Sequence, residues 1–103
     1  MSTPDQDPAE GRNAERIGVT IRAQVRAGTD KMTIDVTDLS RTGFQIETVH
    51  RLALESKVYL VIPGLSGFEA VVKWSRRDLY GCAFVSPLHE AVFDNLLRLS
   101  KTR

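Results

Sequence analysis

The sequence predicts an all-β domain with a C-terminal helix, and more specifically a six-stranded antiparallel β-barrel closed by that helix. From residue 17 onward, apolar and polar residues alternate with the two-residue period of half-buried strands. Short clusters of turn residues separate these segments, which is typical of antiparallel connections. Near residue 86 the period changes to that of an amphipathic helix, which can cover the open mouth or one side of the sheet.

The first two strands are expected to form a hairpin. Residues 17–26 alternate strictly, beginning with Ile17, and residues 27–31 (AGTDK) form a turn cluster before residues 32–37 resume the alternation. Asp38 continues the inward phase of this second strand. A carboxylate in that phase must lie at the end of the strand or have a partner, because burying it alone is costly.

Three further segments complete the predicted sheet, and one more strand precedes the helix. Alternation resumes at Phe44 and Ile46, after Gly43. Residues 57–62 (KVYLVI) are mostly apolar, which predicts a strand covered on both faces. After the break at PGLSG, residues 68–75 alternate with Trp74 in the inward phase, where a core role is expected, and residues 81–85 form the last strand.

The C-terminal helix is predicted from its start signal and its apolar stripe. Ser86 is expected to be the cap and Pro87 the first helical residue. The stripe comprises Leu88, Val92, Leu96 and Leu99, flanked by Ala91, Phe93 and Leu97. Phe93 and Leu97 add apolar surface beyond the stripe that packs on the sheet, so they could support a homodimer.

Size and composition predict a single domain and limit the classes of function. A chain of 103 residues fits one domain. We expect residues 1–11, which are acidic and polar, to be a flexible tail, and residues 12–103 to be the domain. The single cysteine, Cys82, cannot form an internal disulfide, and the N-terminus is unlike a secretory signal. The sequence therefore predicts a cytoplasmic protein without membrane insertion.

Charge and motif spacing argue against two other classes. A net charge of +1 is too balanced for electrostatic binding of a nucleic acid polymer, which disfavours a barrel that binds RNA or DNA. His50 and His89 lie in no recognisable nucleophile, phosphate-loop or metal spacing, and Cys82 is expected in the core. We therefore expect no enzymatic activity, no metal site and no cofactor.

Two short motifs are the candidate functional features. In RNAER, Arg12 and Arg16 stand four residues apart just before the first strand, and in TDLSRTGF the residues Asp38, Ser40 and Gly43 follow the second strand. Taken separately, the arginine pair also fits a solvated arm or a frayed helical turn. The second motif, taken alone, also fits a β-turn, in which Asp and Ser bond the local backbone and Gly adopts a positive φ.

Together and in this order, the two motifs resemble those of the PilZ domain family. In that family an RxxxR motif precedes the first barrel strand, and a [D/N]xSxxG motif lies between the second and third strands. The resemblance extends from about Arg12 to the C-terminal helix and includes YGCAFV at residues 80–85. It implies a PilZ-like barrel that binds the bacterial second messenger cyclic di-GMP through Arg12, Arg16, Asp38, Ser40 and Gly43.

The chemistry of these residue types agrees with what the resemblance implies. An arginine fork can pair with phosphate oxygens or with the O6/N7 edge of guanine, and an ionised Asp can accept hydrogen bonds from guanine. The resemblance leaves open whether one nucleotide binds or a stacked pair. It implies a receptor whose N-terminal arm and surface change on binding, with output through a separate effector protein. The alternative is a PilZ-like adaptor for pilus assembly or motility that contacts proteins and binds no nucleotide.

Overall fold

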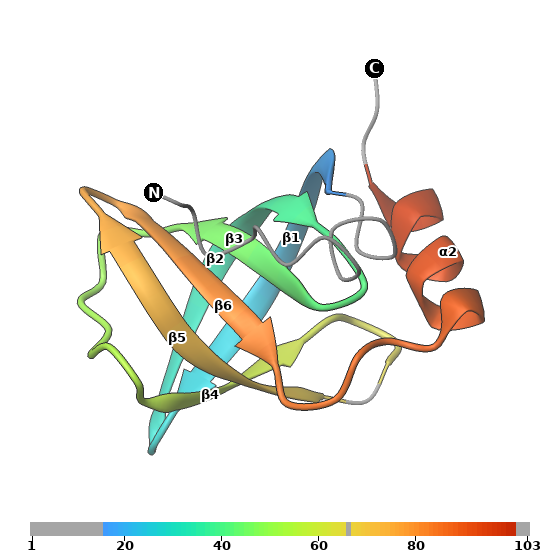
Figure 1. The fold of residues 1–103 in the computed structure, drawn as a ribbon. Helices are drawn as coiled ribbons and strands as arrows, with labels where there is room; N and C mark the ends of the chain where they lie inside the picture. Colours follow the sequence, from blue (N-terminus) through green and yellow to red (C-terminus); the bar gives the residue numbers. More distant parts are fainter. Residues whose placement is uncertain (1–15, 66, 101–103) are drawn as a thin grey trace, which may run out of the picture.

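The computed structural model describes residues 16–65 and 67–100, and it confirms the predicted fold class (Figure 1). The elements, in chain order, are β1 (Ile17–Ala27), β2 (Asp30–Leu39), β3 (Gly43–Glu47), β4 (Lys57–Val61), β5 (Phe68–Arg76), β6 (Leu79–Phe84) and α2 (Glu90–Leu99). The predicted tail at residues 1–11 lies outside the described residues.

The six strands close into a barrel in the order β1-β2-β3-β6-β5-β4, and all neighbours are antiparallel. Three residue pairs between β1 and β4, from Gln24–Val61 to Arg26–Tyr59, complete the closure. Each strand pairs with two neighbours, and β1 pairs with β4 only over Gln24–Arg26, so the first part of β1 has a partner on one side alone among the described strands. One end of the barrel holds the start of β1, the end of β2, the start of β3 and the end of β6.

Two hairpins are tighter than the sequence predicts. The β1–β2 connection contains only Gly28 and Thr29, because both strands extend into the predicted turn cluster. Gly28 has a φ of 64°, which glycine adopts without steric cost. In the same way, β5 and β6 continue to a two-residue turn in which Arg77 has a φ of 56°.

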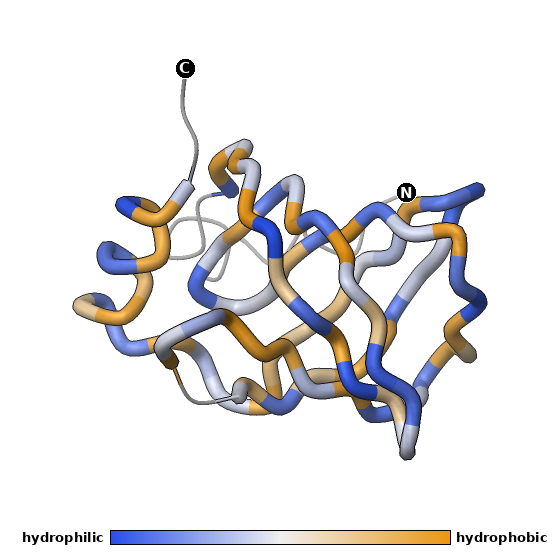
Figure 2. The backbone as a smooth tube through the Cα atoms, turned by 180° about the vertical axis from the view of Figure 1, so that it is seen from behind, coloured by the Kyte–Doolittle hydropathy of each residue, from blue (hydrophilic) through white to orange (hydrophobic). Residues whose placement is uncertain are grey.

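Inward-facing residues of all six strands form one core. Hydrophilic and hydrophobic residues alternate along the strands, as Figure 2 shows. The prediction that residues 57–62 are covered on both faces is wrong. Lys57 and Tyr59 of β4 are exposed, while Val58 and Leu60 are buried. The physical reason is that the helix lies at one end of the barrel (Figure 1) and leaves the outer face of β4 to solvent.

Helix α2 begins later than predicted. Its N-cap is His89, whose Nδ1 accepts a hydrogen bond from the Ala91 amide at 3.0 Å, so the expectation of a start at Ser86 and Pro87 is wrong. Residues 85–89 instead form a non-helical connection from β6 to the helix, with an extended backbone at His89. The amide and carbonyl of Leu88 are bonded to Arg41, so the chain at Leu88 does not continue a helix begun at Ser86.

The apolar side of α2 packs onto the barrel. Leu96 is fully buried, while Phe93 and Leu97 are partly buried against the core. Phe93 and Leu97 thus pack in part within the domain, and their participation in a homodimer stays a prediction. Leu99, a predicted member of the stripe, is 44% exposed. Among the described residues, no helix combines the length and apolar character needed to cross a membrane.

Candidate functional site

The site is built where β2 ends, and a β-bulge determines which side chains face out. The register of β2 against β3 shifts between Val36 and Asp38. Val36 and Leu39 are both buried, whereas the Asp38 side chain is 26% exposed. The expectation that Asp38 continues the inward phase is therefore wrong, because a bulge inserts one extra residue and moves Leu39 into the core. Asp38 lies on the outer wall of the barrel.

The structure brings one residue of each motif together at this wall. Arg16 immediately precedes β1, and its Nη2 lies 3.3 Å from Oδ2 of Asp38 as both a hydrogen bond and an ion pair. The contact follows from the antiparallel register, because Gly18 pairs with Asp38 and Ile17 with Leu39. The two side chains are 49% and 26% exposed, so water screens their attraction. A ligand could replace this pairing at small cost.

Ser40 organises the loop between β2 and β3. Its Oγ accepts hydrogen bonds from the amides of Thr42 and Gly43 at 3.2 and 3.1 Å, and its own amide donates to the Gly43 carbonyl at 2.9 Å. Ser40 is only 5% exposed. Its hydroxyl is thus engaged within the loop, where it gives the chain after Asp38 a defined conformation.

Gly43 allows two strands to approach closely. A Cβ built at this position would collide with the backbone carbonyl oxygen of Cys82 and would lie 3.4 Å from Cα of Ala83. Gly43 is not one of the described glycines with a positive φ, so the turn interpretation of this glycine is not what the backbone requires. Its lack of a side chain lets β3 pair with β6 directly beside the loop.

A row of register partners continues the outer wall beyond Asp38. Asp38 pairs with Gln45 of β3, Gln45 pairs with Gly81 of β6, and Gly81 pairs with Trp74 of β5. A Cβ on Gly81 would collide with the indole of Trp74, so the indole covers the outer side of this glycine. Strands lie about 4.8 Å apart, which puts Gly81 roughly 10 Å from Asp38 along the row.

The prediction that Trp74 faces inward and belongs to the core is therefore wrong. The register of β5 shifts between Val72 and Trp74, so the alternation that buries Val72 does not carry Trp74 into the core. The indole is half-buried on the outer wall instead. Gly81 in YGCAFV could have indicated the outward position of Trp74 from the sequence. A large aromatic residue on a neighbouring strand can cover a glycine in a sheet.

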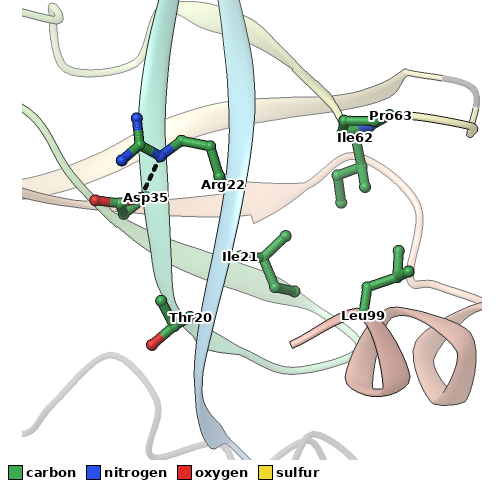
Figure 3. A pocket seen from close by; sticks show the side chains of 7 residues that line it. All are labelled: Thr20, Ile21, Arg22, Asp35, Ile62, Pro63 and Leu99. Carbon is green, nitrogen blue, oxygen red and sulfur yellow. Dashed lines mark ion pairs between the residues drawn. The ribbon is translucent and has the colours of Figure 1, made fainter. Parts of the chain in front are cut away.

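A second arginine–aspartate pair lies apart from the motifs. Nε of Arg22 is 2.9 Å from Oδ1 of Asp35, and the two residues are register partners on β1 and β2. The pair borders an open pocket of about 360 Å³ beside the end of α2 (Figure 3). Thr20, Ile21, Ile62, Pro63 and Leu99 form the rest of its lining. The Arg22 side chain is 72% exposed, so it lies on the solvated outer face of β1.

The cysteine and the two histidines lie outside the candidate site, and two of the three, Cys82 and His89, have a structural role. Cys82 is buried in the core as predicted, and burial raises the pKa of its thiol to about 12. His89 caps α2, and His50 is exposed in the connection between β3 and β4. Within residues 16–65 and 67–100, no group of three or more His, Cys, Asp or Glu residues is arranged to hold a metal ion. Arg12, the first predicted site residue, lies outside this part of the chain.

Comparison with known proteins identifies the family to which the chain is similar. The family model described as "PilZ domain" matches residues 10–101 of the chain, which includes both motifs and every described strand. None of the curated proteins matches the chain.

Proposed function

The chain belongs to the PilZ domain family, whose members are receptor and adaptor domains for cyclic di-GMP and not enzymes, and from this premise we propose that it binds cyclic di-GMP and signals to a separate effector protein. The observation that carries the proposal is the meeting of Arg16 and Asp38 at 3.3 Å across 22 positions of sequence. We place this receptor in the bacterial cytoplasm, where the second messenger is found.

The paired side chains offer complementary groups to one nucleotide. The Arg16 guanidinium can donate two parallel hydrogen bonds to a phosphate or to the O6/N7 edge of a guanine. The Asp38 carboxylate accepts from the N1–H and amino group of guanine. Because each side chain is partly exposed, both can turn to the ligand without leaving a buried charge unpaired.

The outer wall beside Asp38 can receive the base. Gln45 adds an amide next to the carboxylate, and the Trp74 indole over Gly81 provides an aromatic surface further along the row. Stacking of a base on an aromatic side chain contributes about 1–3 kcal/mol in proteins that bind nucleic acids. We propose that one guanine of cyclic di-GMP lies along this wall between Asp38 and Trp74.

Ser40, Gly43 and Arg12 have supporting roles in the proposal. Ser40 holds the loop that positions Asp38, and Gly43 lets the wall continue without a protruding side chain. Arg12 completes the RxxxR motif, and we expect it to grip the phosphate from the N-terminal arm. Cyclic di-GMP should then slow amide exchange across residues 5–16, and unchanged exchange at saturation would contradict an arm response.

Isothermal titration of cyclic di-GMP into matched variants tests the proposal. Arg16→Ala and Asp38→Ala should each lose about 1–3 kcal/mol of binding free energy, or roughly 5- to 150-fold in Kd. Asp35→Ala is the control, because it removes a second, more exposed cross-strand pair with Arg22 that lies apart from the motifs. All three variants should change the free energy of unfolding by no more than about 1 kcal/mol.

The same titration decides between the receptor and the adaptor. Saturable heat in the wild type that weakens in Asp38→Ala but not in Asp35→Ala supports the receptor and yields the number of nucleotides bound per chain. A folded wild type that produces no heat would contradict the receptor. The protein would then be an adaptor that acts through protein contacts alone, and its partner complex should survive Arg16→Ala.

A further inference from the structure

Arg41 connects the candidate ligand loop to the segment that leads into α2. It follows Ser40, and its Nε donates a hydrogen bond to the Leu88 carbonyl at 3.0 Å. In return, the Leu88 amide donates to the Arg41 carbonyl at 2.7 Å. Leu88 is 4% exposed and belongs to the core, so this two-way link ends on an anchored residue, two positions before the first residue of the helix.

The same loop also holds the beginning of this connection. The amide of Phe84, the last residue of β6, donates to the Thr42 carbonyl at 2.9 Å. Residues 84–88 are therefore bonded at both of their ends to adjacent residues, Thr42 and Arg41, of the loop that follows Asp38. A change in the conformation of this loop must move the connection to α2 with it.

The other end of α2 is bonded to β1, the strand that follows Arg16. The Thr20 amide in β1 donates to Oγ of Ser100 at 3.0 Å, just after the helix. This strand begins immediately after Arg16, the partner of Asp38. Figure 1 shows α2 at the end of the barrel where β6 finishes. One end of the helix is thus tied to the loop that follows Asp38, and the other end to the strand that begins next to Arg16.

The helix depends on these connections for its position. It has ten residues, and helices shorter than about 12 residues are marginal in water without tertiary contacts. Within the helix, Leu96 is its one fully buried described residue, with Val92, Phe93 and Leu97 partly buried beside it. The equilibrium between docked and loosened α2 can therefore respond to a modest change at either tie.

We propose that Arg41 is a positioning residue that couples occupancy of the Asp38 site to the docking of α2, and that α2 is the element through which the effector protein senses the ligand. This inference rests on the proposed cyclic di-GMP binding. Ligand contacts at Asp38 and Arg16 restrict the loop and the start of β1. Through Arg41–Leu88 and Thr20–Ser100 they favour the docked helix.

Hydrogen exchange of the full chain, with and without saturating cyclic di-GMP, tests this coupling. In the wild type, amides of residues 88–100 should exchange at least about fivefold more slowly with ligand, the lower end of typical couplings between sites. Arg41→Ala should abolish that response while binding persists, weakened by no more than the same factor because coupling is reciprocal. Arg41→Lys, which keeps the charge but not the Nε donor, should behave like Arg41→Ala.

Arg51→Ala is the matched control, because Arg51 is exposed in the connection between β3 and β4 and takes part in no hydrogen bond or ion pair among the described residues. It should retain the full response. Ligand heat without any change at residues 88–100 would overturn the coupling and leave cyclic di-GMP binding intact. A response that persists in both Arg41 variants would overturn the role of Arg41. Absence of ligand heat in the wild type would overturn both the coupling and the receptor.

Discussion

Gly43→Ala should destabilise the barrel, although the residue belongs to a ligand-binding motif. The new methyl group would collide with the Cys82 carbonyl oxygen and press on Cα of Ala83, so β3 and β6 would have to separate. Overpacking of this kind costs about 1–3 kcal/mol. Loss of one ladder hydrogen bond beside the loop adds about 1 kcal/mol. We therefore expect the free energy of unfolding to fall by about 2–4 kcal/mol.

Thermal unfolding followed by circular dichroism measures this loss. For a domain of this size, 1 kcal/mol corresponds to about 4–8 °C, so the Tm should fall by roughly 8–30 °C. Gly18→Ala is the control, because a Cβ there meets nothing within 4 Å. Its Tm should stay the same or rise slightly, since alanine restricts the unfolded chain. An unchanged Tm in Gly43→Ala, together with lost ligand binding, would refute the structural role and favour direct contact with the base.

Three further substitutions test separate parts of the structure. Ser40→Ala should lower the free energy of unfolding by about 1–3 kcal/mol in urea titrations, because two loop amides lose their buried acceptor. Gly81→Ala should push the indole of Trp74 off the wall, which would appear as a shift in the emission of this sole tryptophan and as weaker ligand binding; an unshifted spectrum would contradict the packing. Burial raises the pKa of Cys82 from 9.0 to about 12, so the unfolded thiol ionises first and stability should fall as pH rises from 9 to 12. In urea titrations, the free energy of unfolding of Cys82→Ala should fall less between pH 9 and 12 than that of the wild type. An equal fall in the two proteins would contradict the prediction.

Local pattern was sufficient to predict the strands and the helix. Alternation of apolar and polar residues specifies which face of a strand is buried, and it identified the inward residues of β1 and the first part of β2 correctly. It failed at Asp38 and Trp74, where register shifts move one residue out of phase. A bulge is a property of two paired strands, so the pattern of one strand does not reveal it. The helix start was misplaced for a similar reason, because Leu88 is held by bonds to Arg41.

The sequence by itself determined the class of fold, the family and the two motifs, because alternation, turn residues and motif spacing are local properties of the chain. Only the tertiary structure decided that Arg16 meets Asp38, that the wall continues through Gln45 to Gly81 and Trp74, and that the loop is bonded to α2. These contacts join residues far apart in the chain, and the closure of the barrel sets which of them become neighbours.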